Sequence, residues 1–198
     1  MKINNENLKA LKEMGIKVPS YHRESLKREC VHIGLGHFHR SHFLTYMDKL
    51  LDAKITDSGV FEIDIVPSNE SFISSLESQD YMYSLSQLSP DGKCDFRING
   101  AIVGYANQTK NPEIVEEVLS SAETKLITLT ITEKGYCYLD QEGTLDWNNP
   151  SVSHDINTSE TPKSAVGVLA KALYSRYKNN LPVTVMSCDN VPENGKML

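Results

Sequence analysis

The chain has 198 residues, of which 26 are acidic and 20 basic, giving a net charge of −6 at pH 7. Hydrophobic residues make up 39% of it and charged residues 23%, as in an ordinary soluble domain. This acidic balance argues against a nucleic-acid partner, which needs a basic face. No apolar stretch approaches the roughly 20 residues that cross a bilayer, and the N-terminal segment lacks the apolar core of a secretory signal. We therefore expect a cytoplasmic protein with neither a nucleic-acid nor a membrane partner.

The cysteines are few and widely separated. They are Cys30, Cys94, Cys137 and Cys188, and no two of them have the C-x-x-C spacing. This spacing excludes a zinc ribbon and a dense disulfide framework. We expect reduced, mostly buried thiols.

The hydrophobic pattern of the first third alternates between strand and helix. Residues 31–34 predict a short strand that ends in a glycine turn, and residues 38–51 predict a helix with one buried face. A second strand is expected at 61–66, closed by Pro67, and a short helix at 69–76.

A turn sequence then interrupts the alternation. Residues 81–89 and 93–105 flank Ser-Pro-Asp-Gly at positions 89–92, which predicts an antiparallel hairpin. Pro112 opens a predicted helix through residue 119, with acidic residues in its early turns.

The last third resumes the alternation. Residues 125–132 (KLITLTIT) are typical of a strand buried on both faces of a parallel sheet, and residues 182–188 predict another strand. Between them we expect a polar surface loop at 140–161 and a helix at 165–177. The predicted apolar face of that helix contains Val166, Leu169, Ala170, Leu173 and Tyr177. The pattern as a whole predicts an α/β fold: a doubly wound, mainly parallel sheet with an inserted β-hairpin.

The segment VHIGLGHFHRSH at residues 31–42 carries the most information about function. A strand is followed by Gly34-x-Gly36 and then at once by a helix, an order that suits the approach of a dinucleotide pyrophosphate. The third glycine of the usual pattern is replaced by His39, so a turn in which the glycines only relieve backbone strain is the alternative. Arg40 favours the phosphate interpretation, because a guanidinium pairs well with phosphate and a cation is unusual in a first helical turn.

Three histidines, His37, His39 and His42, lie in the same segment. They raise the hypothesis of a metal site, but zinc needs further ligands, and no Cys or acid stands at a supporting spacing. We therefore expect no metal.

A dinucleotide fold also needs an acid near the end of its second strand, to accept hydrogen bonds from the adenosine ribose. Glu62, Asp64 and Glu70 are the candidates, and Asn69 offers a further polar group. We favour Glu70, because it comes just after the predicted strand, whereas Asp64 lies within it. No basic cluster follows, so we expect NAD rather than NADP.

Four segments, in chain order, resemble signatures of the mannitol dehydrogenase family of long-chain polyol dehydrogenases. Residues 34–42 resemble G-x-G-x-F-H-R-x-H, 79–85 are similar to Q-D-x-L-Y-T-L, 130–137 resemble T-x-T-E-K-G-Y-C, and 187–195 resemble S-C-D-N-x-x-x-N-G. The first signature has His at the position of His39, so the incomplete glycine pattern becomes a match.

The resemblance implies a zinc-independent, NAD-dependent oxidoreductase with a Rossmann-type N-terminal domain and a helical substrate domain. It implies that Gly34, Gly36, Phe38 and Arg40 bind the cofactor, and that Thr132, Glu133 and Lys134 line its nicotinamide side. Asn190 would steady the reacting substrate oxygen, since an amide donates to an oxygen that gains charge. Without the resemblance, residues 132–135 are a plain exit from a strand and Asn190 is a loop amide.

In this family the general base is a Lys in the C-terminal domain, and the present sequence ends at Leu198, before such a motif. We therefore expect residues 1–198 to form the NAD-binding domain of a longer enzyme, with 1–29 as a leading segment. The partner would be the C-terminal domain of the same polypeptide, and this chain alone would be inactive. Residues 65–69 depart from the glycine-rich or acidic run common in the family.

The expected substrate is a small polyol, keto-sugar or sugar acid, and the expected reaction interconverts a polyol and its keto-sugar, of the mannitol/fructose type. Residues 18–23 (VPSYHR) resemble mannitol 2-dehydrogenases, whereas 132–137 and 192–195 lean toward the arabinitol and uronate branches. The alternatives are therefore an arabinitol dehydrogenase and a uronate reductase of the fructuronate/mannonate type. An NAD-binding module without turnover and a histidine-metal enzyme are two further alternatives.

Overall fold

The computed structural model describes residues 2–66, 69–139, 143–158 and 160–198. Its contacts divide the chain into two compact units. The first unit contains the described residues of 1–28, 37–61 and 68–104, and the second contains those of 29–36, 62–67 and 105–198. The predicted strand end at Pro67 lies outside the described residues, as do residues 140–142 and 159 of the expected loop.

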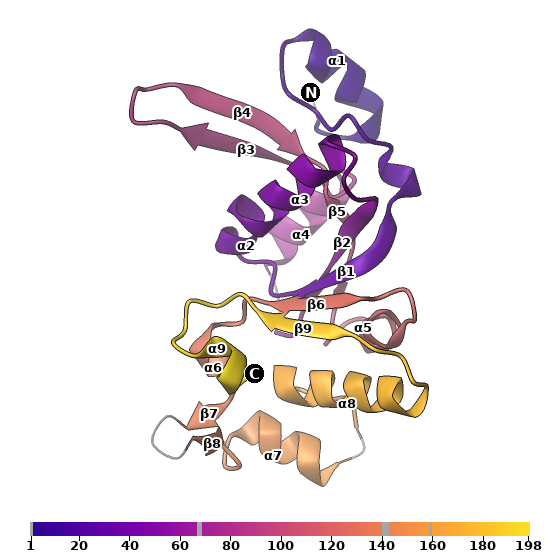
Figure 1. Cartoon of the computed structure of the whole chain (residues 1–198), viewed down its shortest axis with the longest axis vertical. Helices are drawn as coiled ribbons and strands as arrows, with labels where there is room; N and C mark the ends of the chain where they lie inside the picture. Colours follow the sequence, from indigo (N-terminus) through magenta and orange to yellow (C-terminus); the bar gives the residue numbers. More distant parts are fainter. Residues whose placement is uncertain (1, 67–68, 140–142, 159) are drawn as a thin grey trace. The chain divides into compact units, whose positions relative to one another are not determined.

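Five strands form the main sheet, in the order β5-β2-β1-β6-β9 (Figure 1). They are β1 (Lys27–Ile33), β2 (Ser58–Asp64), β5 (Ile102–Asn107), β6 (Leu126–Leu129) and β9 (Thr184–Ser187). β6 pairs in parallel with both β1 and β9, so their carboxyl ends share one edge. The first strand lies in the middle and the sheet grows outward on both sides, which confirms the predicted doubly wound α/β fold.

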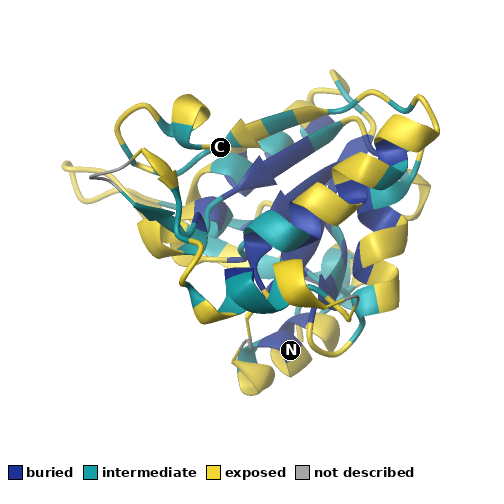
Figure 2. Ribbon diagram, turned by 90° about the horizontal axis from the view of Figure 1, so that it is seen from below, coloured by how far each residue is buried: buried dark blue, intermediate teal, exposed yellow. Residues whose placement is uncertain are grey.

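Two long helices of the second unit, α5 (Pro112–Ser120) and α8 (Ala165–Lys178), pack against each other. Pro112 stands at the first position of α5, and the Ser164 hydroxyl caps α8 by accepting from the Gly167 amide. Both helices confirm the predicted ranges. In Figure 2 the buried residues gather in the strands, while the helices alternate between buried and exposed stretches.

The predicted buried face of α8 is wrong. Tyr177 is 80% exposed and Leu173 37% exposed, and the face that is buried contains Ala165, Val168, Leu169, Ala172 and Arg176. The Arg176 guanidinium is buried because it donates to the backbone carbonyls of Leu119, Ser121, Thr124, Leu181 and Pro182. An arginine at the end of the helix therefore takes the place that the pattern assigned to an aromatic ring.

Short elements complete the second unit. They are α6 (Thr132–Gly135), β7 (Tyr138–Leu139), β8 (Thr144–Leu145), α7 (Pro150–Asn157) and α9 (Asn194–Met197). The expectation of an irregular loop at 140–161 is wrong where the structure describes it. Asn149 accepts from the Ser151 amide, Pro150 takes the first helical position, and Val152 is buried, so a capped helix forms in a polar segment.

The first unit carries the remaining helices. Two 3₁₀ turns (Asn5–Asn7 and Arg23–Ser25) accompany α1 (Leu8–Glu13), α2 (His37–Ser41), α3 (Phe43–Asp52) and α4 (Glu70–Glu77). The helix expected at 38–51 is broken into α2 and α3 at His42, whose φ of −114° and ψ of −79° depart from helical values. The helix expected at 69–76 is confirmed as α4, with Asn69 as its N-cap.

The predicted hairpin is confirmed as an antiparallel ribbon of β3 (Tyr83–Leu88) and β4 (Cys94–Asn99), which form a two-stranded sheet of their own (Figure 1). Its second strand does not continue to residue 105 as expected, because the chain turns at Gly100. Asn99 holds this turn by donating to the Leu44 carbonyl and accepting from the Ala101 amide, and β5 then joins the main sheet.

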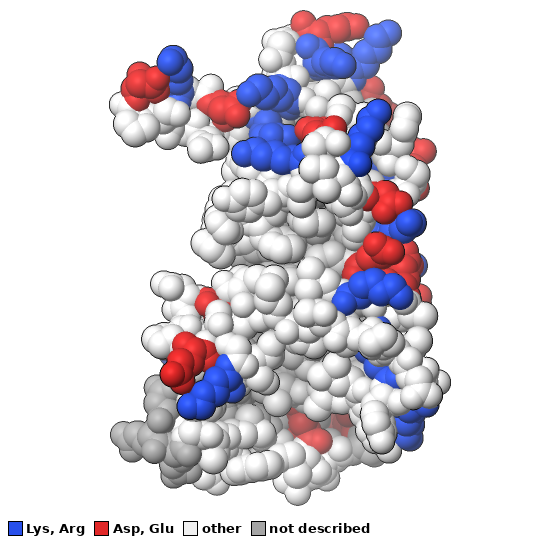
Figure 3. Space-filling model, in the orientation of Figure 1, with Lys and Arg blue, Asp and Glu red and all other residues white. Residues whose placement is uncertain are grey.

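Surface charge and thiol burial complete the description. Acidic and basic side chains are interspersed on the face shown in Figure 3. Among the described helices, none is both long and apolar enough to span a bilayer. The four cysteines are free, and only Cys30 is buried, so the expectation of mostly buried thiols is wrong. Burial raises the pKa of the Cys30 thiol to about 12.

Candidate functional site

The two glycines after β1 occupy different environments. Gly34 has a φ of +105°, and a Cβ at this position would lie 2.2 Å from the Thr130 carbonyl oxygen. Gly36 is exposed, and the nearest atom to a Cβ there is the Gly34 oxygen at 3.9 Å. The fold therefore requires glycine at position 34. At position 36 the backbone instead lies open to an approaching group.

A buried chain of polar side chains supports the Gly34 turn. The Thr130 hydroxyl donates to the Gly34 carbonyl at 2.9 Å, so it must accept from His32 Nε2, which lies 2.8 Å away. His32 Nδ1 then accepts from the Thr128 hydroxyl at 2.6 Å. His32 is fully buried, and this chain ties the end of β1 to the end of β6.

Asp64, at the end of β2, holds the residue between the glycines. Its Oδ1 accepts from the Leu35 amide at 3.0 Å, and its Oδ2 accepts from the Tyr105 hydroxyl at 3.1 Å. The Gly34 amide donates to the Ile63 carbonyl at 2.8 Å. The carboxylate that the sequence offered as a ribose ligand thus supports the turn itself.

Glu70 and Asn69 lie at the start of α4. Asn69 is the N-cap, accepting from the Phe72 amide, and Glu70 is exposed in the first turn of the helix. An acid in the first turn also interacts favourably with the helix dipole.

Arg40 and Phe38 lie in α2, within the first unit. The Arg40 guanidinium carbon lies 4.3 Å from the centroid of the Phe72 ring, and the Tyr83 hydroxyl donates to the Arg40 carbonyl at 2.6 Å. Phe38 is 56% exposed and stacks on His42 with 4.8 Å between ring centroids. A ring under the guanidinium limits the directions in which Arg40 reaches.

The three histidines of this segment do not gather around one point. His39 is fully buried and stacks on Phe43, whereas His37 and His42 are exposed. Burial and the neighbouring Arg40 lower the pKa of His39 to about 3. Among the described residues, no group of three or more His, Cys, Asp or Glu side chains is arranged to hold a metal ion.

The strand predicted at 125–132 ends earlier, at Leu129, and α6 begins at Thr132. Thr132, Glu133 and Lys134 are all exposed, and Thr132 has a φ of +63°. A left-handed threonine is strained, so the chain turns sharply where sequence alone predicts a continuing strand.

Asn190 follows β9 and is exposed, and its side chain forms no hydrogen bond with any residue that the structure describes. The preceding residue, Asp189, is within reach of α6. Its Oδ2 accepts from the Ile131 amide at 2.9 Å and its Oδ1 from the Thr132 amide at 3.0 Å. The structure thus brings together the segment 131–134 and the segment that carries Asn190, both in the second unit.

Sequence reasoning missed two groups that shape this region, the Asp189 carboxylate and the Tyr136 phenol, and it considered the Asp64 carboxylate only as a ribose ligand. An acid at or just beyond the end of a strand was the available signal for both carboxylates. This signal does not distinguish a ligand of the cofactor from a ligand of the backbone.

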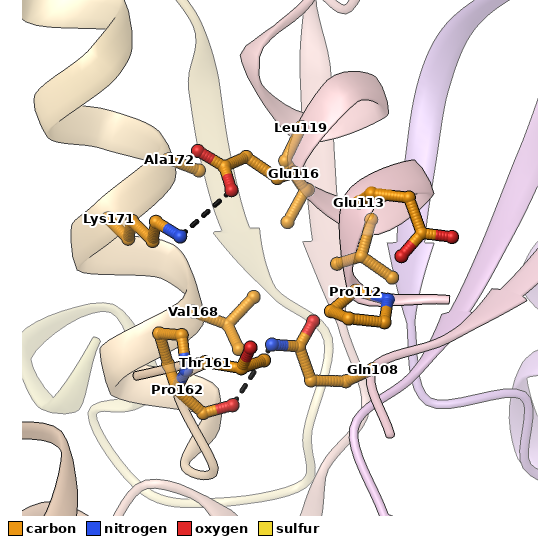
Figure 4. A pocket seen from close by; sticks show the side chains of 11 residues that line it. Gln108, Pro112, Glu113, Glu116, Leu119, Thr161, Pro162, Val168, Lys171 and Ala172 are labelled. Carbon is orange, nitrogen blue, oxygen red and sulfur yellow. Dashed lines mark hydrogen bonds and ion pairs between the residues drawn. The ribbon is translucent and has the colours of Figure 1, made fainter. Parts of the chain in front are cut away.

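A separate cavity of about 220 Å³ lies between α5 and α8 (Figure 4). Gln108 lines it and donates from Nε2 to the Pro162 carbonyl at 2.9 Å, which turns Oε1 the other way, and this buried oxygen has no partner among the described residues. The Lys171–Glu116 ion pair lies at 2.8 Å beside it. Sequence reasoning did not indicate this cavity.

Comparison with known proteins identifies the family. Residues 28–198 match the model of the mannitol dehydrogenase Rossmann domain. The chain is 35% identical to D-mannonate oxidoreductase of Escherichia coli, over 89% of this chain and 37% of that protein. It is 34% identical to mannitol 2-dehydrogenase of Neosartorya fischeri, over 100% of this chain and 41% of that protein.

A solved structure resembles the chain over its whole length. It is Pseudomonas fluorescens mannitol 2-dehydrogenase in a ternary complex with NAD and D-mannitol, with a TM-score of 0.93 and 31% identity. The match covers 100% of this chain and 40% of that one, so the chain spans less than half the length of its relatives. With most of its residues matched by the family model, the chain belongs to the mannitol dehydrogenase family of oxidoreductases and contains its Rossmann domain.

Proposed function

We propose that this chain binds NAD(H) for a zinc-independent oxidoreductase that interconverts a polyol and its keto-sugar, of the mannitol/fructose type. The observation that carries the proposal is the pair of glycines after β1. Gly34 is needed by the backbone, whereas nothing in the described structure requires glycine at position 36. A glycine that the fold does not need, at the edge where β1 and β6 end, suits the approach of a pyrophosphate.

The residues present fit the dinucleotide. The open backbone at Gly36 receives the pyrophosphate, Arg40 pairs with a phosphate, and Phe38 covers the cofactor with its exposed ring. Glu70 accepts from the ribose hydroxyls, a role that Asp64 does not take because its oxygens hold Leu35 and Tyr105. When bound, NAD supplies the hydride acceptor. The solved NAD complex of the P. fluorescens relative supports this choice of cofactor.

The substrate side is assigned to Asn190 and to the turn after β6. The exposed Asn190 amide donates to the reacting oxygen, and this hydrogen bond strengthens as the oxygen gains negative charge. Thr132, Glu133 and Lys134 line the nicotinamide side. We assign the base that moves the proton to a further part of the polypeptide. The coverage supports this assignment, because the chain spans only 37–41% of the relatives that it matches.

Titration with NADH tests cofactor binding, followed by the fluorescence of the reduced nicotinamide. Gly36→Asp places a carboxylate beside the pyrophosphate, and like charges about 4 Å apart repel by about 4 kcal/mol at an effective dielectric of ~20. The dissociation constant should therefore rise far more than tenfold. Gly92→Asp, the same change at an open glycine in the hairpin turn, is the control and should bind as the wild type does. Equal binding by all three chains would refute the assignment.

The substrate is tested on the full-length protein with NAD and a panel of mannitol, arabinitol and mannonate. We expect kcat/KM to be highest for mannitol. The E. coli mannonate oxidoreductase is as similar to this chain as the mannitol 2-dehydrogenase is, so the uronate reductase is the second candidate. A preference for mannonate would establish it in place of the polyol reaction.

A binding module without turnover is distinguished by the same two assays. We expect the 198-residue chain to bind NADH and to leave polyols unoxidised, while the full-length protein oxidises them. Binding without turnover in the full-length protein would favour the module.

A further inference from the structure

One carboxylate holds the turn after β6 from the neighbouring strand β9. Asp189 lies two residues beyond β9. It accepts from the Ile131 and Thr132 amides at 2.9 and 3.0 Å, and from the Tyr136 hydroxyl at 2.8 Å. The three donors lie before, within and directly after α6, so Asp189 contacts both ends of this short element.

The direction of the hydrogen bonds follows from the chemistry of the groups. A carboxylate only accepts, so Tyr136 must donate its single proton to Asp189. Ser187 Oγ, 2.6 Å from the Tyr136 oxygen, must then donate to Tyr136. Burial is the main cause that raises the pKa of Tyr136 well above its usual range; the hydrogen bond from Ser187 lowers it and Asp189 raises it further, so the phenol stays protonated. A continuous chain therefore runs from Ser187 through Tyr136 to Asp189.

The turn that Asp189 contacts is strained. Thr132 has a φ of +63° and Cys137 a φ of +51°, so two non-glycine residues in the left-handed region bound α6. Such conformations persist only where surrounding contacts hold them. At Thr132, one such contact is the hydrogen bond from the Thr132 amide to the Asp189 carboxylate.

The backbone that leads to Asn190 is held as well. Asn194 Nδ2 donates to the Asp189 carbonyl at 3.0 Å and to the Ser187 carbonyl at 3.4 Å. Asp189 is thus fixed through both its side chain and its main chain, and Asn190 projects from the next position along the chain.

We infer that Asp189 is a positioning residue: its carboxylate fixes the turn at residues 131–136 against the end of β9 and thereby sets the position of Asn190. The role in the reaction rests on the proposed function, whereas the contact with the turn does not. The expected consequence is that loss of this carboxylate impairs the chemical step more than it impairs dinucleotide binding.

Three variants separate the contributions of the Asp189 carboxylate, the Tyr136 hydroxyl and the backbone strain at Thr132. Asp189→Asn keeps the size but replaces one acceptor oxygen with an NH₂ group, which faces a donor and leaves at least one of the three donors without an acceptor. Tyr136→Phe is the matched control, because it removes the phenol and leaves both amide bonds to Asp189. Thr132→Gly relieves the left-handed strain and, combined with Asp189→Asn, keeps the chain folded where the single change lowers its stability.

Amide hydrogen exchange measured by NMR tests the contact in this chain. In Asp189→Asn, or in the double variant, exchange of the backbone amides of residues 131 and 132 should accelerate at least tenfold. In Tyr136→Phe it should change less than threefold. Unchanged exchange in Asp189→Asn would overturn the inference.

Kinetics of the full-length protein test the positioning role. In Asp189→Asn, kcat for polyol oxidation should fall at least tenfold, while the dissociation constant for NADH rises less than threefold, because the turn at Gly34–Gly36 is untouched. If kcat fell by the same factor as the dissociation constant for NADH rose, or if kcat did not change, the positioning role would be refuted. If the wild-type protein neither binds NADH nor oxidises polyols, the proposed function fails, and the exchange experiment still decides the contact.

Discussion

Replacement by alanine should have different effects at the two glycines of the turn after β1: it should lower stability at Gly34 and weaken NADH binding at Gly36. Gly34→Ala forces an L-residue to a φ of +105° and places its Cβ 2.2 Å from the Thr130 carbonyl oxygen. That oxygen belongs to backbone and has no flexible end to move away. In Gly36→Ala the nearest atom to the new Cβ is the Gly34 carbonyl oxygen, at 3.9 Å.

The cost at Gly34 has two parts. A non-glycine residue in a sparsely populated backbone region costs about 1–3 kcal/mol. Overpacking costs about 1–3 kcal/mol more, since relief of the overlap must shift Thr130 and its bonds to Ile33 and Gly34. We therefore expect Gly34→Ala to lower the free energy of unfolding by about 2–6 kcal/mol, and Gly36→Ala to change it by less than about 1 kcal/mol.

Urea denaturation followed by circular dichroism measures both variants, and NADH fluorescence measures their binding. Gly36→Ala should fold normally and bind NADH at least tenfold more weakly, because its methyl group enters the space that the pyrophosphate needs. A loss of less than about 1 kcal/mol in Gly34→Ala would refute the structural role of the first glycine. Undiminished NADH binding by Gly36→Ala would refute the role of the second.

Further predictions concern buried charges and the metal hypothesis. Arg176→Met removes the guanidinium donor from five backbone carbonyls, and one of them, that of Ser121, also accepts from the Thr124 amide. It should lower the free energy of unfolding by about 3 kcal/mol or more in urea denaturation, with Arg176→Lys in between. Burial lowers the pKa of His39 to about 3, below the ordinary value near 6.5, so the unfolded chain binds the proton that the folded chain rejects. The contribution of His39 to the free energy of unfolding is therefore fully present above pH 6.5 and is lost as the pH falls. Between pH 7 and pH 5 the free energy of unfolding should fall by about 2 kcal/mol. The His42→Gln variant should show the same fall, and the His39→Leu variant should not. The full-length enzyme should keep its activity in excess EDTA, and loss of activity that zinc restores would revive the metal hypothesis.

The regular elements were predictable because their residues repeat at the period of the element. The run at 125–132 predicts a buried strand, and its parallel pairs with β1 and β9 confirm it. Its end was not predictable, because Thr132 has strong β propensity yet takes a left-handed conformation that tertiary contacts impose. The prediction of the buried face of α8 was wrong for a related reason. Arg176 is buried by backbone carbonyls from distant segments, and an apolar pattern does not register them.

The glycine turn was predictable from spacing, since only glycine serves a positive φ and a close approach. The break of the helix at His42 was not predictable, because the apolar residues on either side of His42 keep helical spacing across the break. The positions of the candidate site residues followed from the elements that carry them. Their hydrogen bonds did not follow, because a polar side chain at a strand end has many potential partners and sequence names none of them.

Two of these strand-end acids follow one physical rule. Asp64 ends β2 and accepts from the Leu35 amide after the neighbouring β1, and Asp189 follows β9 and accepts from the Ile131 and Thr132 amides after the neighbouring β6. Each also accepts from a tyrosine hydroxyl, of Tyr105 and Tyr136 respectively.

The carboxyl edge of a parallel sheet is where the chain leaves its strands, so amide groups there lose their partners in the ladder. A carboxylate from the adjacent strand supplies the missing acceptor, and it also accepts from a tyrosine hydroxyl. In this chain an acid at a strand end therefore holds the loop that follows the neighbouring strand.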